Sequence, residues 1–156
     1  MANADCYRTV AEIVEQQIVK GQDEVVPERS VNMAVVVSAM GGKPKVTDLL
    51  LDSVQAAASR NESEVERLLG LVYEKHTHCL SNLFEEAENQ RLSTIIKSDL
   101  GDIKDILKTV ALMKWQASRI KELVSGYGEL WSAQILSALL KQRSSPDTHF
   151  VYIDAR

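Results

Sequence analysis

The sequence predicts an α/β fold in which helices dominate and strands are few. Residues 33–37 read Met-Ala-Val-Val-Val, a β-branched run without polar alternation, which is typical of a strand buried on both faces of a parallel sheet. Residues 150–153, Phe-Val-Tyr-Ile, form a second short apolar run. About five other segments carry helical periodicity. Because two strands make a poor independent sheet, the pattern is typical of a piece of a larger α/β domain.

Apolar side chains recur at helical spacing along most of the chain. The first expected helix covers residues 5–20, where Asn3 or Asp5 provides the N-cap and Gly21 ends the helix. The charged residues 22–32 are expected to form a loop. Four further helices are expected at residues 47–59, 61–83, 89–121 and 129–141.

Composition excludes several classes of protein. The 156 residues include 18 Lys and Arg against 22 Asp and Glu, which gives a net charge of −4 and no attraction to nucleic acid or anionic membranes. Cys6 and Cys79 are too few for a disulfide framework. The longest uncharged stretch, residues 30–42, is shorter than the roughly 20 apolar residues of a membrane span. A soluble protein of the cytoplasm or an organelle matrix is expected.

The first candidate site lies where the first predicted strand ends. Ser38, Gly41 and Gly42 place a hydroxyl group and glycine amides there, and Thr47 begins the next expected helix. Free N–H groups at such places bind anionic ligands. The alternative is an ordinary turn in which Thr47 is only the N-cap of the helix. Neither a Walker loop nor a G-x-G-x-x-G fingerprint occurs in the sequence.

The second candidate is Glu129, which follows the sequence Ser-Gly-Tyr-Gly at residues 125–128. These four residues predict a flexible junction, after which Glu129 opens an apolar helix. On one interpretation, the glycines allow a ligand to approach and Glu129 accepts hydrogen bonds from its ammonium group. On the other, the carboxylate is there because the dipole of the helix stabilises it.

A third pattern, His76-Thr77-His78-Cys79, invites interpretation as a metal site. His76 and Cys79 share one face of the expected helix, whereas His78 points away. No second cluster of ligands occurs in the sequence, since His149 stands alone. A half-buried, structural His76 is therefore the expected outcome.

Four segments of the chain resemble the aspartate kinase family, in the same order. Residues 35–40 followed by residues 46–50 resemble its V-S-A strand end and its V-T-[DN]-x-L helix start. Residues 125–133 resemble its S-x-G-E-x-x-S-A segment, and residues 152–156 resemble the following strand with D-A-R. Residues 2–14 are similar to its first helix. The sequence Gly-Glu-Leu-Trp-Ser-Ala at residues 128–133 is most similar to that of the plant and algal bifunctional aspartokinase–homoserine dehydrogenases.

This resemblance implies the amino-acid kinase fold, a three-layer α/β/α sandwich, of which this chain would hold a part with two or three short parallel strands. It implies transfer of the γ-phosphoryl group of ATP, with Mg²⁺ as cofactor, to the side chain of L-aspartate. Carried over residue by residue, Ser38 and Thr47 bind aspartate near its carboxylates, and Glu129 pairs with its α-ammonium group. Asp154 and Arg156 match the motif without an assigned role.

The resemblance also implies that residues 1–156 form an incomplete N-terminal part of the catalytic domain. The family's K-F-G-G-T-S phosphate loop, its ATP-binding half and its ACT domains are absent from these residues. The isolated chain is therefore expected to lack kinase activity. L-Aspartate and ATP are the expected partners, with no nucleic acid and no membrane, and the location is the cytoplasm, or the plastid stroma in a plant or alga.

Two alternatives remain open at this point. One is a non-catalytic module that binds aspartate or associates with proteins, through exposed strand edges or through the apolar helix at residues 129–141. The other is an unrelated helical protein in which the four matches arise by chance.

Overall fold

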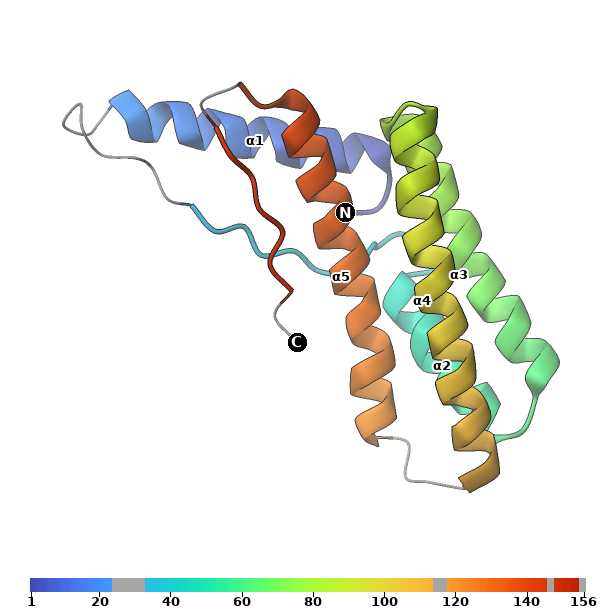
Figure 1. Ribbon diagram of the computed structural model, residues 1–156. Helices are drawn as coiled ribbons and strands as arrows, with labels where there is room; N and C mark the ends of the chain where they lie inside the picture. The colour runs from blue at the N-terminus through green and yellow to red at the C-terminus, as the bar shows by residue number, and fades with distance from the viewer. Residues whose placement is uncertain (24–32, 114–117, 146–147, 155–156) are drawn as a thin grey trace.

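A computed structural model describes residues 1–23, 33–113, 118–145 and 148–154. These residues form five α-helices and no β-strand. The helices are α1 (Ala4–Asp23), α2 (Val46–Ala58), α3 (Glu62–Leu83), α4 (Glu86–Met113) and α5 (Ser118–Arg143), as Figure 1 shows.

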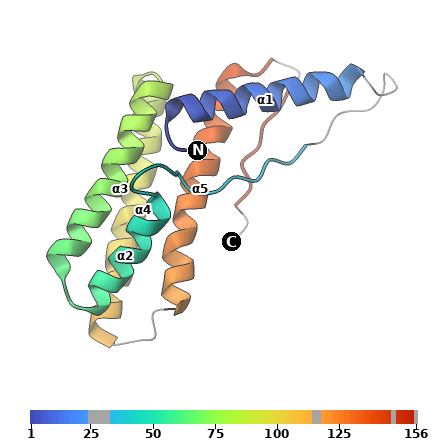
Figure 2. The same cartoon turned by 180° about the vertical axis from the view of Figure 1, so that it is seen from behind.

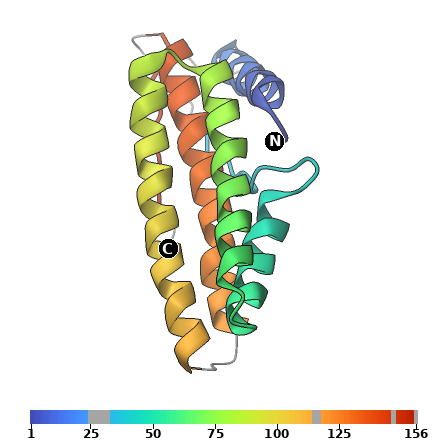
Figure 3. The same cartoon turned by 90° about the vertical axis from the view of Figure 1, so that its right-hand side faces the viewer.

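The long helices α3, α4 and α5 lie side by side, and the shorter α2 packs against all three of them (Figure 3). Helix α1 crosses the end of this bundle where α3 turns into α4 (Figure 1). The core is aliphatic apart from a few aromatic side chains, with Leu50, Leu80, Ile103, Trp131 and Ile135 among its most deeply buried members. Among the described residues, no helix has the length and apolar character needed to cross a lipid bilayer.

The prediction of a partial α/β/α sandwich with parallel strands is wrong for this structure. Residues 33–41 and 148–154 are extended, but neither segment pairs in a ladder with the other or with any other described residue. Residues 148–154 run along the side of α5 that faces away from α3 and α4, whereas residues 33–41 cross α5 to reach the start of α2 (Figures 1 and 2). A strand requires neighbours for its backbone groups. The described residues supply none, and packing between helices forms the core instead.

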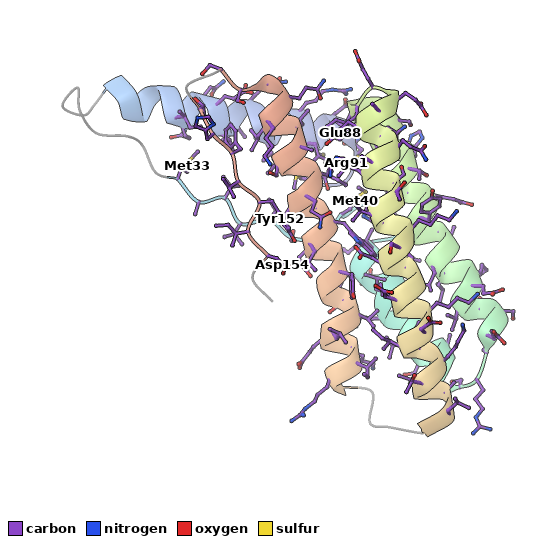
Figure 4. All side chains as sticks on the ribbon, in the orientation of Figure 1. Met33, Met40, Glu88, Arg91, Tyr152 and Asp154 are labelled. Carbon is purple, nitrogen blue, oxygen red and sulfur yellow. The ribbon has the colours of Figure 1, made fainter. Side chains whose placement is uncertain are left out.

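The two extended segments leave large apolar side chains in water. Val36 is 95% exposed, and Val151 and Ile153 are 77% and 79% exposed. Figure 4 shows that Met33 lies well away from the helices, whereas Met40 lies at the bundle, where its side chain is buried. Within the described residues, the two apolar runs therefore neither form the predicted strands nor become buried on both faces.

The expected ends of α2 and α3 are close to those observed. The side chain of Asn61 accepts a hydrogen bond from the backbone N–H of Glu64 at 3.2 Å, so Asn61 is the N-cap of α3 as predicted. The cap predicted for α2 is wrong, because Lys45 holds the N-cap position and Thr47 lies in the first turn.

Three other helix boundaries differ from the prediction. Helix α1 continues through Gly21 to Asp23, and α4 ends at Met113 rather than near residue 121. The flexible junction expected at residues 125–128 is instead part of α5. A glycine inside a helix costs only about 1 kcal/mol relative to alanine, and the burial of Tyr127 and Trp131 outweighs that cost. The loop expected at residues 22–32 lies mostly outside the described residues.

Candidate functional site

Backbone hydrogen bonds fix the turn that joins the first extended segment to α2. The N–H of Gly41 donates to the carbonyl of Met1 at 2.7 Å, and the N–H of Val46 donates to the carbonyl of Met40 at 3.0 Å. Lys75 of α3 donates from Nζ to the carbonyl oxygen of Pro44 at 2.7 Å. These contacts hold residues 40–46 against both the N-terminus and α3.

Helix α5 approaches this turn closely at Gly128. A methyl group built on Gly128 would stand 2.7 Å from Cβ of Ala39, 3.3 Å from Cγ1 of Val46 and 3.7 Å from Cδ1 of Leu50. The backbone of α5 therefore lies directly on the side chains of Ala39 and of the start of α2. Few contacts between a helix and its neighbours are this close, because any residue with a Cβ atom prevents them.

This contact brings together the segments that carry all three predicted site residues. Ser38 precedes Ala39, Thr47 follows Val46, and Glu129 follows Gly128. Neighbouring Cα atoms are about 3.8 Å apart, so the three backbones surround one small region. Ser38 is exposed, whereas Thr47 and Glu129 are half-buried.

The position of Glu129 within its helix differs from the predicted one. This residue lies well inside α5, which begins at Ser118, so it does not open a helix. The dipole of a helix acts mainly on its first and last turns. Helix-dipole stabilisation, the alternative explanation of this acidic residue, therefore does not apply.

The buried side of α5 next to Glu129 carries polar contacts that the sequence did not predict. Nε1 of Trp131 donates a hydrogen bond to Oδ2 of Asp99 on α4 at 2.7 Å. The ring of Trp131 meets the ring of His76 edge to face, with 5.1 Å between centroids and an interplanar angle of 78°. These contacts fix the rotation of α5 about its axis, and with it the direction of Glu129.

A second buried contact ties α1 to the same turn of α5. The hydroxyl groups of Tyr7 and Ser132 are hydrogen-bonded at 3.0 Å, and both side chains are fully buried. Burial raises the pKa of the Tyr7 hydroxyl, which therefore stays protonated at neutral pH. Further along both helices, Arg143 at the end of α5 donates two hydrogen bonds to Glu15 of α1, at 2.8 and 2.9 Å. The sequence signal for the contact between Tyr7 and Ser132 is a serine next to Trp131 in the apolar part of α5.

The structure gives no support to the interpretation of His76 and Cys79 as metal ligands. His76 is fully buried rather than half-buried, and burial lowers the pKa of its imidazole to about 4. Burial raises the pKa of the Cys79 thiol to about 11, which disfavours the thiolate that binds metals. No group of three His, Cys, Asp or Glu residues within the described ranges is arranged to hold a metal ion.

A large polar groove lies elsewhere, between α3 and α4, with a volume of about 690 Å³. Its hydroxyl groups mostly donate to carbonyls of their own helices, as Thr77 does to Tyr73 and Thr94 does to Gln90. None of the three predicted site residues lines it. We therefore place the candidate site at the contact around Gly128, where the segments that carry the motif residues lie together, rather than in the groove between α3 and α4.

Sequence comparison identifies relatives over most of the chain. Over 142 residues, or 91% of the chain, it is 33% identical to the chloroplastic bifunctional aspartokinase/homoserine dehydrogenase of Daucus carota. Over 132 residues, or 85% of the chain, it is 33% identical to the chloroplastic enzyme 1 of the same name from Arabidopsis thaliana. The chain is homologous to bifunctional aspartokinase/homoserine dehydrogenases. No protein-family model matches it.

This homology confirms the resemblance drawn from the four motifs and excludes chance as its origin. A bifunctional aspartokinase/homoserine dehydrogenase of Buchnera aphidicola is also related, at 22% identity over 92% of the chain. The chain spans about 14% of the length of the carrot and Arabidopsis relatives. Of the last motif, Asp154 is extended and exposed, and Arg156 lies outside the described residues.

Proposed function

We propose that residues 1–156 supply the aspartate-binding part of an aspartate kinase site. The observation that carries the proposal is the contact of Gly128 with Ala39 and Val46, which gathers the segments of the three motif residues at one place. The homologous proteins are named as aspartokinases, which supports aspartate as the ligand.

The chemistry of the three side chains matches that of aspartate. The ligand carries two carboxylates and one ammonium group, and hydroxyl groups such as those of Ser38 and Thr47 donate hydrogen bonds to carboxylates. The carboxylate of Glu129 accepts hydrogen bonds from the ammonium group. Next to them, Ala39 and Val46 are buried and provide an apolar floor for the proposed site.

The described residues do not fit a site for Mg²⁺ and ATP. They contain no group of three metal-ligating side chains, and no K-F-G-G-T-S sequence occurs in the chain. The proposal therefore concerns the binding of aspartate only. We propose that purified residues 1–156 form no aspartyl phosphate from ATP, which an aspartyl-hydroxamate assay against a Glu129→Ala control measures.

We propose that the complete enzyme to which this site belongs converts ATP and L-aspartate to ADP and 4-phospho-L-aspartate. This is the first step toward lysine, threonine and methionine. The plastid stroma is the proposed location if the source is a plant or an alga, in keeping with the relatives, whose names describe them as chloroplastic.

Replacing Glu129 with Gln is expected to weaken the binding of L-aspartate by about 10- to 100-fold, because a hydrogen bond to a charged group contributes about 1.5–3 kcal/mol. Isothermal titration calorimetry measures the change in affinity. N-Acetyl-L-aspartate, which lacks the ammonium group, should bind the wild type and Glu129→Gln with similar, low affinity.

The matched control for this experiment is Glu122→Gln, a change at an exposed acidic residue on the same helix. Its affinity for L-aspartate should equal that of the wild type. If the wild type does not bind L-aspartate, or if Glu129→Gln binds it equally well, the proposed function is wrong.

The exposed extended segments favour a second candidate function, a module that associates with itself. The apolar side chains of residues 129–141 do not provide the interface, because most of them are buried within the chain. Residues 33–39 are uncharged, and no described residue pairs with their backbone. Unpaired extended segments of this kind add to one another edge to edge.

If this second function holds, the wild type sediments as a dimer at micromolar concentrations and Val36→Lys sediments as a monomer. A lysine on an exposed edge opposes pairing because two copies would bring like charges together. Sedimentation velocity measures the masses. Leu112→Lys is the control, since Leu112 is 80% exposed but lies on α4. A monomeric wild type eliminates this candidate.

A further inference from the structure

We infer that Gly128 is a positioning residue, which sets how closely α5 approaches the turn that carries Ser38 and Thr47 and so directs Glu129 toward the ligand. This inference rests on the proposed binding of aspartate. Glycine has no side chain, so the role of Gly128 lies in the space that it leaves free.

The space at Gly128 is too small for any other residue. Real Cβ atoms essentially never come within 3.0 Å of another heavy atom, yet a Cβ built here lies 2.7 Å from Cβ of Ala39. That atom is bonded directly to the backbone of residue 39, so a change of rotamer cannot move it away. To reach an ordinary contact of 3.4 Å, α5 and the extended segment at Ala39 must separate by about 0.7 Å.

Backbone conformation does not require glycine at this position. Gly128 lies inside α5 and does not have a positive φ. Among the described glycines, Gly42 is the one with a positive φ. A glycine within a helix destabilises it by about 0.5–1 kcal/mol relative to alanine. Gly126, two residues earlier on the same helix, has no atom within 4 Å of a built Cβ. The requirement at position 128 is therefore one of space.

The separation caused by a side chain acts on the proposed site directly. Glu129 follows Gly128 on α5, whereas Ser38 and Thr47 are next to the two residues that a Cβ would contact first. The hydroxyl groups and the carboxylate would move apart by nearly an ångström. Hydrogen bonds to one ligand tolerate only a few tenths of an ångström, so the ligand would lose contact with one of the two sides.

The test compares three variants by titration calorimetry with L-aspartate. Gly128→Ala should weaken binding by at least about tenfold. The double variant Gly128→Ala/Ala39→Gly, which removes the atom at 2.7 Å, should recover affinity to within about threefold of the wild type. Gly126→Ala should bind as the wild type does, and it should be at least as stable.

Binding of N-acetyl-L-aspartate separates positioning from general damage to the fold. Because Gly128 acts through Glu129, Gly128→Ala should bind this analogue as well as the wild type does, whereas a damaged fold would lose both ligands. If Gly128→Ala does not fold, the double variant Gly128→Ala/Ala39→Gly provides the test. If the double variant folds but does not recover affinity for L-aspartate, the inference is wrong. Equal affinity of Gly128→Ala and the wild type for L-aspartate also overturns it, while leaving the proposed function intact. If the wild type does not bind, the proposed function itself fails.

Discussion

Replacing Trp131 with alanine is expected to lower the free energy of unfolding by about 3–5 kcal/mol. Trp131 is fully buried at the centre of the bundle, where its ring contacts Tyr127 and His76. Its truncation leaves a large cavity and removes the hydrogen bond from Nε1 to Asp99. The loss is a large part of the total stability of a domain of this size, which is typically about 5–15 kcal/mol.

Urea denaturation followed by circular dichroism at 222 nm measures this change without relying on tryptophan fluorescence. Trp131→Phe keeps most of the apolar contact but lacks the N–H group, so it should cost about 1–2 kcal/mol. Leu112→Ala, at a position that is 80% exposed, should change the free energy by less than about 0.5 kcal/mol. A loss below about 1 kcal/mol for Trp131→Ala would show that the described packing around it is wrong.

The second large effect is a loss of stability in mild acid, caused by His76. Its Nδ1 lies 2.7 Å from the carbonyl oxygen of Val72, which can only accept, so Nδ1 carries the proton of the neutral ring. Nε2 is buried and has no hydrogen-bond partner among the described residues. Protonation would place a charge and an unpaired N–H group in the core. Burial, together with the charge of Lys75, lowers the pKa of His76 to about 4.

The direction of this pH effect follows from the pKa of His76 in the unfolded and folded states. The unfolded chain binds a proton at His76 near pH 6.5, whereas the folded chain binds it only near pH 4. Stability is therefore complete above pH 6.5 and declines as the pH falls from 6.5 toward 4. Between pH 7 and pH 5, the free energy of unfolding should fall by about 2 kcal/mol.

Denaturation at pH 7 and pH 5 checks this prediction. His76→Gln should lose most of the pH dependence, whereas His78→Gln, at an exposed position, should keep it. Paired carboxylates do not interfere with this measurement between pH 7 and pH 5. Their basic partners lower their pKa values from 4.5 or 3.8, so the stability that these pairs contribute is lost only below that range. The paired carboxylates are Glu15, Glu64, Glu66, Glu88 and Asp105. Equal slopes for the wild type and His76→Gln would contradict the role of His76.

The sequence predicted those parts of the fold that depend on local interactions. The boundary between α2 and α3 was correct because Asn61 is a local cap and the apolar spacing on both sides is regular. The two strands were wrong because pairing depends on neighbours, which the apolar run at residues 33–37 cannot reveal. The expected break at residues 125–128 was wrong for a related reason. Two glycines weaken a helix only slightly, and burial of the surrounding side chains decides the outcome.

For the candidate site, the sequence proposes residues but does not indicate the contacts that support them. The sequence motifs point to Ser38, Thr47 and Glu129, and the structure brings the segments that carry them together at Gly128. The supporting contacts join residues far apart in the chain. Tyr7 meets Ser132 across 125 positions, and Trp131 meets Asp99 across 32. No local pattern encodes such pairs, because they depend on how α1, α4 and α5 pack.

The apolar side chains that residues 33–36 and 151–153 leave in water have a practical consequence for work with the protein. Fluorescent probes such as anilinonaphthalene sulfonate become bright on exposed apolar surface, and this response is commonly used as a sign of a molten globule. Here the fully folded chain already offers such a surface. Staining therefore does not indicate a loosened core, and dye-based thermal melts begin from a bright baseline.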